Sequence, residues 1–381
     1  MTNEDLATRI EQEFERQKEA VSRPNLMVVG GTGVGKSSLI NTVFGAKVAE
    51  TGSGTPVTRG CVRYEQPEIP VAIYDTEGYE IIEGGQEDPS NFQTVVLAKV
   101  RELQQQPIDA QIHLVWYCIS VGGHKITDYD LKNIQELLQI RGGNGTASRM
   151  KLAVVLTQCD TDSLNKDNQG EGSLAIRSIL ADSGITVPVF ETSCDPEFPL
   201  DLTDLIEWSS QALPDESYRE GFIAAQRYSL QKKRTAAYAT LAGFTATAAG
   251  IGGANPLPLS DAALLIPLQM GMASRLAALY GFTSFGEQVM ALLKTQLLTV
   301  VGKSMAASIT KFIPVAGQVI NAGVAASLTG GMGYALIEIY TRAYNEMLKT
   351  GRMPDWTKYL SMKSILSAFE QGKEAWENQN V

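Results

Sequence analysis

The sequence predicts an α/β domain with a mostly parallel sheet and helices on both faces, joined to an all-α helical domain. Three observations carry this prediction. A glycine-rich loop follows a short apolar run near residue 25, strand-like runs alternate with helical patterns as far as residue 213, and no strand pattern appears after residue 216. We therefore expect an N-terminal helix over 1–22, the α/β domain over 23–215 and the helical domain over 216–381.

The N-terminal helix is expected to be amphipathic. Leu6, Ile10, Phe14 and Val21 fall along one face of residues 3–22, and acids and amides occupy the other faces. This apolar stripe needs a partner, and the sheet already has helices for both of its faces. We expect the helix to pack on the helical domain, which would make that domain discontinuous in sequence.

A phosphate-binding pattern, G-x-x-x-x-G-K-S, spans residues 30–37. It follows a strand-like run and opens a helix, which is the context that this pattern requires. Glycines let backbone N–H groups face a phosphate chain, the Lys36 ammonium would reach the β- and γ-phosphates, and the Ser37 hydroxyl would ligate Mg²⁺. The predicted phosphate-binding residues are Gly30, Gly31, Thr32, Gly33, Val34, Gly35, Lys36, Ser37 and Ser38.

A second strand-like run, near 71–75, ends in an acid. Asp75 closes the run, and Gly78 follows three positions later. A carboxylate at the carboxyl end of a strand beside the phosphate loop can hold Mg²⁺ through water, and the N–H of a following glycine can donate to the γ-phosphate. Asp75 and Gly78 are therefore candidate catalytic residues, together with Lys36 and Ser37.

Two further strand ends predict which base is bound. Asp160 comes shortly after the run 151–156, and its carboxylate can accept from the N1–H and the exocyclic amine of guanine; adenine lacks this pair of donors. Backbone N–H groups after the run 187–192 could hold the guanine oxygen. The predicted ligand is therefore GTP or GDP with Mg²⁺. The predicted base-binding residues are Thr157, Gln158, Asp160, Ser193 and Cys194.

These motifs in this order resemble the TRAFAC class of GTPases, most of all its Era, septin and immunity-related branches. The resemblance covers roughly residues 24–213. It departs from the family at Gln158, where relatives usually carry Lys, and at Cys194, where they carry Ala. Glutamine can lie flat over the base but has no charge, so the resemblance implies guanine selectivity with lowered affinity.

The resemblance also places switch I in the loop 52–60, which is rich in Gly, Ser and Thr. Thr58 and Arg59 match the end of switch I in Era-like proteins. The resemblance therefore implies Thr58 as a Mg²⁺ ligand and catalytic residue, with Thr55 as the second choice. The alternative is an ordinary polar loop without this role.

The catalytic group of the family is missing. Tyr79 stands where many GTPases place the glutamine that orients the attacking water, and Gly33 stands where potassium-using Era-like proteins carry Asn. Slow intrinsic hydrolysis is expected unless Glu77, Glu80 or a partner supplies the missing group.

An arginine could also act in trans. Arg59 or Arg63 could serve across a homodimer formed through the GTPase face. Alternatively, both are solvated surface charges.

The net charge of −10 is unevenly distributed. Residues 1–215 carry 17 Lys and Arg against 32 Asp and Glu, whereas residues 216–381 carry 15 against 10. The acidic first part excludes nonspecific nucleic-acid binding, and no basic RNA-binding module follows it, which disfavours an Era-like ribosome factor. The mildly basic second part suits either an anionic membrane surface or an ordinary soluble domain.

The N-terminal sequence and the cysteines indicate a cytoplasmic protein. The first residues are acidic and polar, without the apolar stretch of a signal peptide. Of the two histidines, His113 is expected in the core and His124 in a loop. No C-x-x-C pair occurs, so reduced thiols are expected at Cys61, Cys118, Cys159 and Cys194.

The helical half is unusually poor in charge. Residues 235–340 contain seven charged side chains, and Thr235–Ser260 and Phe312–Ile337 are each uncharged over 26 residues. Both stretches are long enough to cross a bilayer but are rich in Ala, Thr and Gly. They fit either a soluble bundle with small residues at its helix contacts or a membrane hairpin with reversible insertion.

The helical half also has a resemblance. Pro267–Met270 leading to Leu276–Gly281, and Ile313–Gly317 leading to Gly323–Ala326, look like a bacterial helical domain of unknown function named after YcjF. It often follows GTPases, notably in cyanobacteria, and the likeness covers roughly residues 230–350. The resemblance implies membrane association but no reaction. The layout of the whole chain is similar to that of the dynamin-like immunity-related GTPases.

Two function classes are therefore expected. The first is a slowly hydrolysing GTP switch that dimerises or acts at the inner face of a membrane. The second is a soluble regulatory GTPase that binds a protein or assembly partner without a membrane role.

Overall fold

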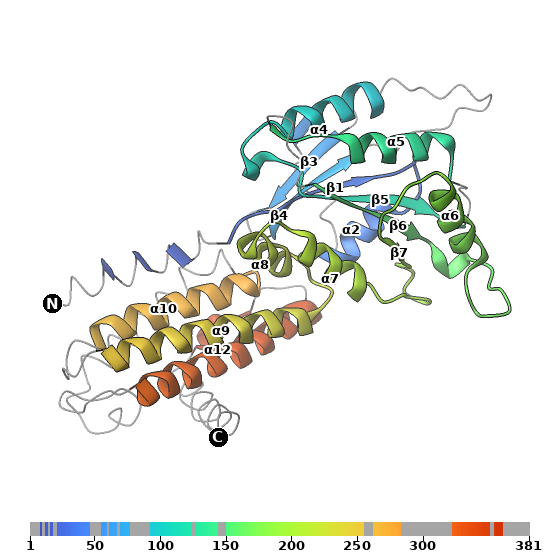
Figure 1. The fold of residues 1–381 in the computed structure, drawn as a ribbon. Coiled ribbons are helices and arrows are strands. Elements are labelled where there is room, and N and C mark those ends of the chain that lie inside the picture. The colour runs from blue at the N-terminus through green and yellow to red at the C-terminus, as the bar shows by residue number, and fades with distance from the viewer. Residues whose placement is uncertain are drawn as a thin grey trace. The chain divides into compact units, whose positions relative to one another are not determined.

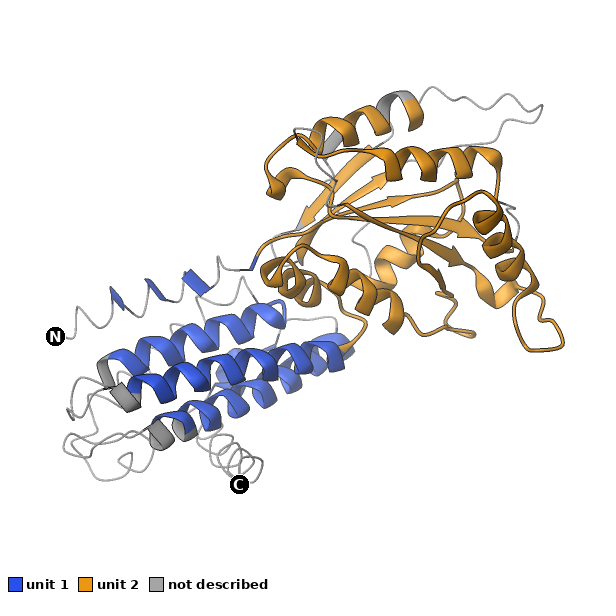
Figure 2. Ribbon diagram, in the orientation of Figure 1, with its two compact units in different colours: residues 1–21, 230–381 blue, residues 22–229 orange. Residues whose placement is uncertain are grey.

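The computed structural model of the chain describes residues 8–9, 12–13, 16–17, 21–45, 55–58, 61–66, 69–76, 92–122, 126–143, 150–254, 262–282, 322–350 and 354–360 (Figure 1). These residues belong to two compact units, which Figure 2 colours separately. The sheet unit comprises residues 22–229. The helical unit comprises residues 1–21 together with 230–381.

Seven strands form one sheet in the sheet unit. They are β1 (Asn25–Val29), β2 (Thr55–Thr58), β3 (Cys61–Gln66), β4 (Ile69–Thr76), β5 (Leu114–Ser120), β6 (Lys151–Thr157) and β7 (Val189–Glu191). Their order is β2-β3-β4-β1-β5-β6-β7, and all pairs from β4 to β7 are parallel, whereas β2-β3 and β3-β4 are antiparallel. The carboxyl ends of the parallel strands therefore meet at one edge of the sheet, where α/β folds bind ligands.

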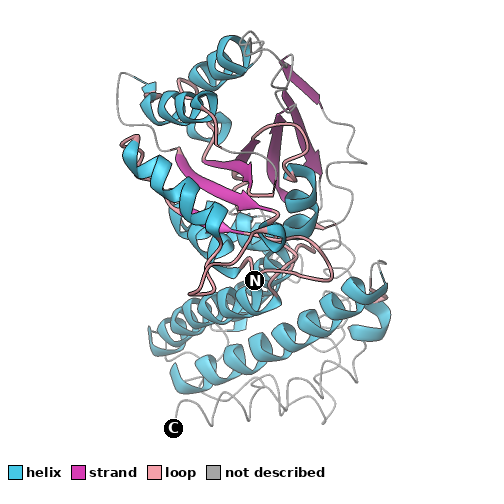
Figure 3. Cartoon of the chain, turned by 90° about the vertical axis from the view of Figure 1, so that its right-hand side faces the viewer, coloured by secondary structure: helices cyan, strands magenta, loops and turns pink. Residues whose placement is uncertain are grey.

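Helices cover both faces of this sheet (Figure 3). Met27 and Val29 share a core with one set of helices, and Leu26 and Val28 share a core with the other set, because successive strand side chains point to opposite faces. The first set is α4 (Leu97–Leu103), α5 (Asp128–Gln139) and α6 (Glu171–Asp182), and the second is α2 (Lys36–Phe44), α7 (Thr203–Ala212) and α8 (Glu216–Ala225). The predicted fold class is confirmed.

Short helical segments complete the sheet unit. They are the π-helical turn η1 (Phe92–Val96) and the 3₁₀ turns η2 (Ile108–Ala110) and η4 (Cys159–Thr161). A reciprocal capping box of Thr127 and Asp130 fixes the start of α5: the Asp130 N–H donates to Thr127 Oγ1 at 3.2 Å, and the Thr127 N–H donates to Asp130 Oδ2 at 2.9 Å.

The prediction of a continuous loop over 52–60 is wrong in part. Thr55–Thr58 forms the edge strand β2, with Thr55 opposite Arg63 and Thr58 opposite Cys61. Its register shifts between Pro56 and Thr58, which suits an edge strand because proline cannot donate to a ladder. Pairing with β3, and not a local apolar pattern, makes this segment a strand.

The sheet unit extends past the expected boundary at residue 215. Asp215 caps α8 by accepting from the N–H of Ser217 at 3.0 Å. Tyr218 and Phe222 of α8 are buried in the core of the sheet unit, and the Phe222 ring lies edge-on to Trp116 of β5 at 6.4 Å. Pro214 therefore bends the chain without taking it out of this unit.

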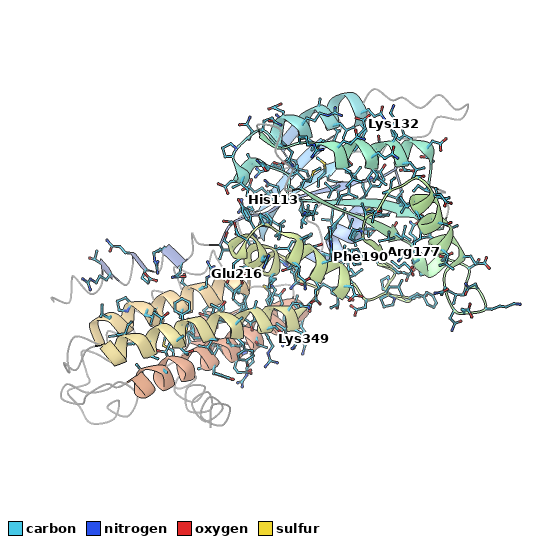
Figure 4. The ribbon with its side chains drawn as sticks, in the orientation of Figure 1. His113, Lys132, Arg177, Phe190, Glu216 and Lys349 are labelled. Carbon is cyan, nitrogen blue, oxygen red and sulfur yellow. The ribbon has the colours of Figure 1, made fainter. Side chains whose placement is uncertain are left out.

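His113 is a core residue, as predicted (Figure 4). It lies just before β5, and its Nδ1 accepts from the N–H of Asn25 at 2.9 Å. Burial lowers the pKa of His113 to about 4. The imidazole is therefore neutral at physiological pH and ties the start of β1 to the start of β5.

The helical unit is α-helical over most of its described part. Its core holds an aromatic cluster in which the centres of the Phe282 and Trp356 rings are 4.8 Å apart. Lys233 is also buried there, and its ammonium lies 5.1 Å from the centre of the Tyr344 ring. Among the described residues, no helix combines the length and apolarity that a bilayer span requires. The helices are α9 (Leu230–Ala254), α10 (Ala262–Leu279), α12 (Ala322–Thr350) and α13 (Trp356–Tyr359).

The N-terminal segment groups with the helical unit and has helical turns at 8–9, 12–13 and 16–17. The guanidinium of Arg275 in α10 donates to the carbonyl of Gln17 at 3.3 Å. A Cβ atom at Gly271 would approach Cγ of Glu13 to 2.8 Å, so glycine allows this close approach. Leu6, Ile10 and Phe14 lie outside the described residues and Val21 is half-buried, so the apolar stripe of these four residues remains a prediction.

Candidate nucleotide-binding site

The loop between β1 and α2 has a backbone that glycine adopts most readily. Gly33 and Gly35 have φ angles of 77° and 91°. A Cβ atom at Gly30 would lie 2.3 Å from the carbonyl oxygen of Cys118 in β5, so this position has no room for a side chain. The loop is therefore folded tightly against the carboxyl end of the sheet.

Lys36 is the first residue of α2 and is 9% exposed. Its ammonium donates to the carbonyls of Gly30 and Gly31, at 2.9 Å each. Burial lowers the pKa of Lys36, and the nearby groups Cys118 and Asp75 oppose this effect. The loop thus holds a desolvated positive charge on two neutral acceptors, where phosphate oxygens would be stronger partners.

The other loop residues surround the start of α2. Thr32, Gly33, Ser37 and Ser38 are exposed, whereas Val34 is buried. The first turn of α2 contains no acid. Its free N–H groups and positive dipole end are therefore available to an anion, as the sequence pattern predicts.

Asp75 lies in β4 opposite Val28 of β1, at the same end of the sheet as the glycine-rich loop. Its Oδ1 is buried and has no hydrogen-bond partner. Burial raises the pKa of Asp75, and the charge of Lys36 pulls it back down. A buried carboxylate oxygen without a partner is costly, and a bound cation would satisfy it.

These residues fit a Mg²⁺ ion shared with phosphates. The Ser37 hydroxyl and the Asp75 carboxylate are oxygen donors, which Mg²⁺ prefers, and Mg²⁺ takes few protein ligands when phosphates supply the others. In the described part of the chain, no group of three or more His, Cys, Asp or Glu could hold a metal by itself.

The structure describes only some of the other predicted catalytic residues. Thr58 ends β2, and the position of its side chain lies outside the described residues, as does the whole of Gly78. Arg63, predicted either to act in trans or to be a solvated surface charge, forms an ion pair with Glu65, and its guanidinium carbon lies 5.7 Å from the centre of the Tyr74 ring. Arg63 therefore has partners in its own strand β3 and in the neighbouring strand β4.

Glu77, Tyr79, Glu80 and Arg59 also lie outside the described residues.

A cavity of about 330 Å³ opens beside the glycine-rich loop. It brings together segments that the sequence predicted to bind the base. The Ser193 hydroxyl donates to Asp160 Oδ1 at 2.6 Å, which holds the carboxylate at the cavity. The lining residues are Gly35, Ser38, Thr157, Gln158, Asp160, Thr161, Thr192, Cys194 and Asp195.

Gln158 connects the base end of the site to the glycine-rich loop. Its backbone is left-handed, with φ 57°, and its Nε2 donates to the carbonyl of Gly33 at 3.3 Å. Its Oε1 accepts from the Ser120 hydroxyl at the end of β5. The preceding residue, Thr157, donates its hydroxyl to the carbonyl of Val34 at 2.5 Å. Both side chains therefore bind the loop that would hold the phosphates.

Thr192 and Asp195 also line the cavity but were not predicted from the sequence. Thr192 donates to the carbonyl of Leu156 at 2.9 Å, and the Asp195 N–H donates to Ser193 Oγ at 3.2 Å. Both flank the predicted Ser193 and Cys194, so their position next to a strand end could have identified them. The contact of Ser120 with Gln158 joins residues that are distant in sequence, so no local sequence pattern predicts it.

The first part of the chain is similar to known GTPases. Residues 25–153 match a family model described as 50S ribosome-binding GTPase. Septin-8-A of Xenopus laevis is 25% identical over 190 residues, which cover 45% of this chain and 42% of the septin. The chain thus spans less than half the length of this curated relative. The family match ends before Thr157, so it does not reach the predicted base-binding residues.

Two solved structures of Toc33 from Arabidopsis thaliana are also similar. One is a dimerization-deficient mutant, with 16% identity and a TM-score of 0.34, covering 57% of this chain and 92% of that chain. The other is a complex with Mg²⁺ and GMPPNP, with 18% identity and a TM-score of 0.31, covering 57% and 89%. Residues 22–229 have the sheet topology of a P-loop GTPase fold, and the family match covers residues 25–153 of this unit.

Proposed function

We propose that this chain is a GTP switch that binds GTP with Mg²⁺ and hydrolyses it slowly to GDP and phosphate. The observation that supports this most is that Lys36 and Asp160 both lie at the carboxyl ends of the parallel strands. The buried Lys36 ammonium caps the phosphate loop, and Asp160 is held by Ser193 in the adjacent cavity. A phosphate-binding loop beside the fixed Asp160 carboxylate suits a guanine nucleotide.

Each residue has a role in this proposal. Lys36 neutralises charge on the β- and γ-phosphates, and Asp160 accepts from N1–H and the exocyclic amine of guanine. Ser37 and Asp75, with Thr58, would hold Mg²⁺, which when bound supplies positive charge to the phosphate oxygens. The Gly78 N–H would donate to the γ-phosphate. Because Tyr79 cannot orient water as glutamine does, hydrolysis stays slow unless a partner contributes a group.

The switch would act in the cytoplasm, by homodimerisation through the GTPase face or at the inner face of a membrane. Phe198 is 65% exposed and Leu200 is 38% exposed, on the segment that follows Asp195 of the base cavity. Exposed apolar side chains next to a ligand cavity support a protein interface that depends on the nucleotide.

Titration calorimetry tests the nucleotide assignment. With Mg²⁺ present, the chain is expected to bind GTP and GDP saturably and to show no saturable binding of ATP at the same concentrations. Equal affinity for ATP and GTP would overturn the proposal.

Two further measurements separate the modes of action. Sedimentation velocity is expected to show a dimer with a non-hydrolysable GTP analogue and a monomer with GDP. Co-sedimentation with anionic liposomes, with and without GTP, tests the membrane. A chain that sediments with liposomes in neither state and remains monomeric would be a soluble regulatory GTPase that uses a protein partner.

A further inference from the structure

A second cavity, of about 460 Å³, lies within the helical unit. Its walls come from three segments: the N-terminal helical turns, the last turn of α9 and the first turns of α10. The lining residues are Arg9, Gln12, Glu13, Arg16, Ile251, Leu264, Pro267 and Leu268. None of them belongs to the proposed nucleotide site.

One wall of this cavity is apolar. Leu264 and Leu268 are one turn apart on α10, so they lie on one face of the helix, and Leu264 is 40% exposed. Ile251 and Leu268 also pack against the buried residues Ala248, Leu265 and Ala325. The apolar wall is thus part of a packed helix contact, which gives it a fixed shape, yet it keeps leucine surface open to the cavity.

The opposite wall carries a net positive charge. Arg16 binds Glu13 through two hydrogen bonds, of 2.9 and 2.6 Å, and Gln17 donates to the same carboxylate at 2.9 Å. Glu13 is therefore already satisfied. Within the described residues, Arg9 has no carboxylate partner, and α9 has no charged side chain after Arg234, so none lies in its last turn at the cavity. Because Arg16 neutralises Glu13, the second arginine, Arg9, is available to an anion.

We propose that this cavity binds a medium-chain alkyl carboxylate, with its alkyl chain along Ile251, Leu264 and Leu268 and its head group on Arg9. The volume lies in the range of small-molecule sites, about 300–1,000 Å³. The apolar wall has no polar side chains for the body of a polar metabolite. An arginine across from leucines fits a molecule that is anionic at one end and apolar along its length.

Calorimetry with the full-length chain and fatty acids below their micelle concentrations tests this site. Binding should be saturable at one molecule per chain, with affinity rising about fourfold per added methylene from octanoate to dodecanoate. Arg9→Ala should weaken dodecanoate binding about tenfold and leave dodecanol binding unchanged. Leu264→Asn should weaken both ligands at least fivefold.

Matched controls lie on α12, away from the cavity lining. Arg342→Ala and Leu348→Asn remove an exposed arginine and a leucine that is 46% exposed, and both should leave dodecanoate binding unchanged. A photoreactive fatty acid should label α10 in the parent chain and lose this label in Leu264→Asn.

Several results would overturn the site. They are the absence of saturable dodecanoate binding, equal weakening by the control variants, and an equal effect of Arg9→Ala on dodecanoate and dodecanol. Binding to anionic phosphatidylglycerol vesicles without binding to monomeric dodecanoate would also overturn it, because it would assign the surface to a bilayer. None of these measurements depends on the nucleotide.

Discussion

At the phosphate end of the proposed site, two buried charges are incompletely satisfied. Lys36 rests on two neutral carbonyls, and Asp75 Oδ1 has no partner. At the base end, the side chains are already paired: Asp160 accepts from Ser193, and Gln158 binds both Ser120 and Gly33. The phosphate end is therefore suited to gain binding energy from a ligand, whereas the base end is suited to select which nucleotide binds.

Substitutions of Lys36 and Ser37 in the phosphate-binding loop should have the largest effect on nucleotide binding. Lys36→Ala is expected to lower GTP affinity at least about 100-fold, because a desolvated point charge on the phosphates is lost. Ser37→Asn should abolish the Mg²⁺ dependence of binding. Both variants should keep the parent fold by circular dichroism. Undiminished GTP binding and hydrolysis by Lys36→Ala would show that this loop is not the phosphate site.

Asp75 should show opposite effects on activity and stability. Asp75→Asn is expected to slow hydrolysis at least about tenfold, since the Mg²⁺ ligand is lost. Without nucleotide it should be more stable than the parent at pH 7, by about 1 kcal/mol, because an unpaired carboxylate oxygen is replaced.

The pH dependence of this gain follows from the direction of the pKa shift. The folded-state pKa of Asp75 is raised above 3.8, so its contribution to stability is fully present below pH 3.8 and is lost as pH rises through the folded pKa. The stability gain of Asp75→Asn should therefore shrink towards pH 4 in denaturant unfolding. A gain of equal size at pH 4 and pH 7 would contradict the burial of this charge.

Gln158 should affect affinity slightly and selectivity not at all. Gln158→Lys adds a positive charge near the nucleotide and keeps a donor for the Gly33 carbonyl, so GTP affinity is expected to rise about threefold. The ratio of GTP to ATP affinity should not change, because Asp160 selects the base through its hydrogen bonds. Gln158→Met, which removes the donor without adding charge, is the control. A changed nucleotide ratio in calorimetry would place Gln158 in base selection.

Much of the sheet unit could be predicted from the sequence because its signals are local. The apolar runs at β1 and β5, the phosphate loop and the Thr127 cap of α5 are each contained in a few neighbouring residues. β2 could not be predicted in this way. Thr55–Thr58 lacks a strand-like apolar pattern, and its conformation depends on pairing with β3.

The candidate site shows the same limit. Strand ends pointed to Asp75, Asp160 and Ser193, because parallel strands bring their carboxyl ends together. The contacts of Thr157 with Val34 and of Ser120 with Gln158 join residues from different strands and loops. Such contacts depend on the packed fold, so a single sequence gives no pattern for them.

In the proposed site, Asp160 selects guanine at a base end whose side chains are already paired. The most direct test is competitive binding of GTP and xanthosine triphosphate to the parent chain and to Asp160→Asn. The amide replaces one acceptor by a donor, so the variant should prefer the xanthosine nucleotide, while the parent prefers GTP. A variant that retains the GTP preference of the parent would contradict the account.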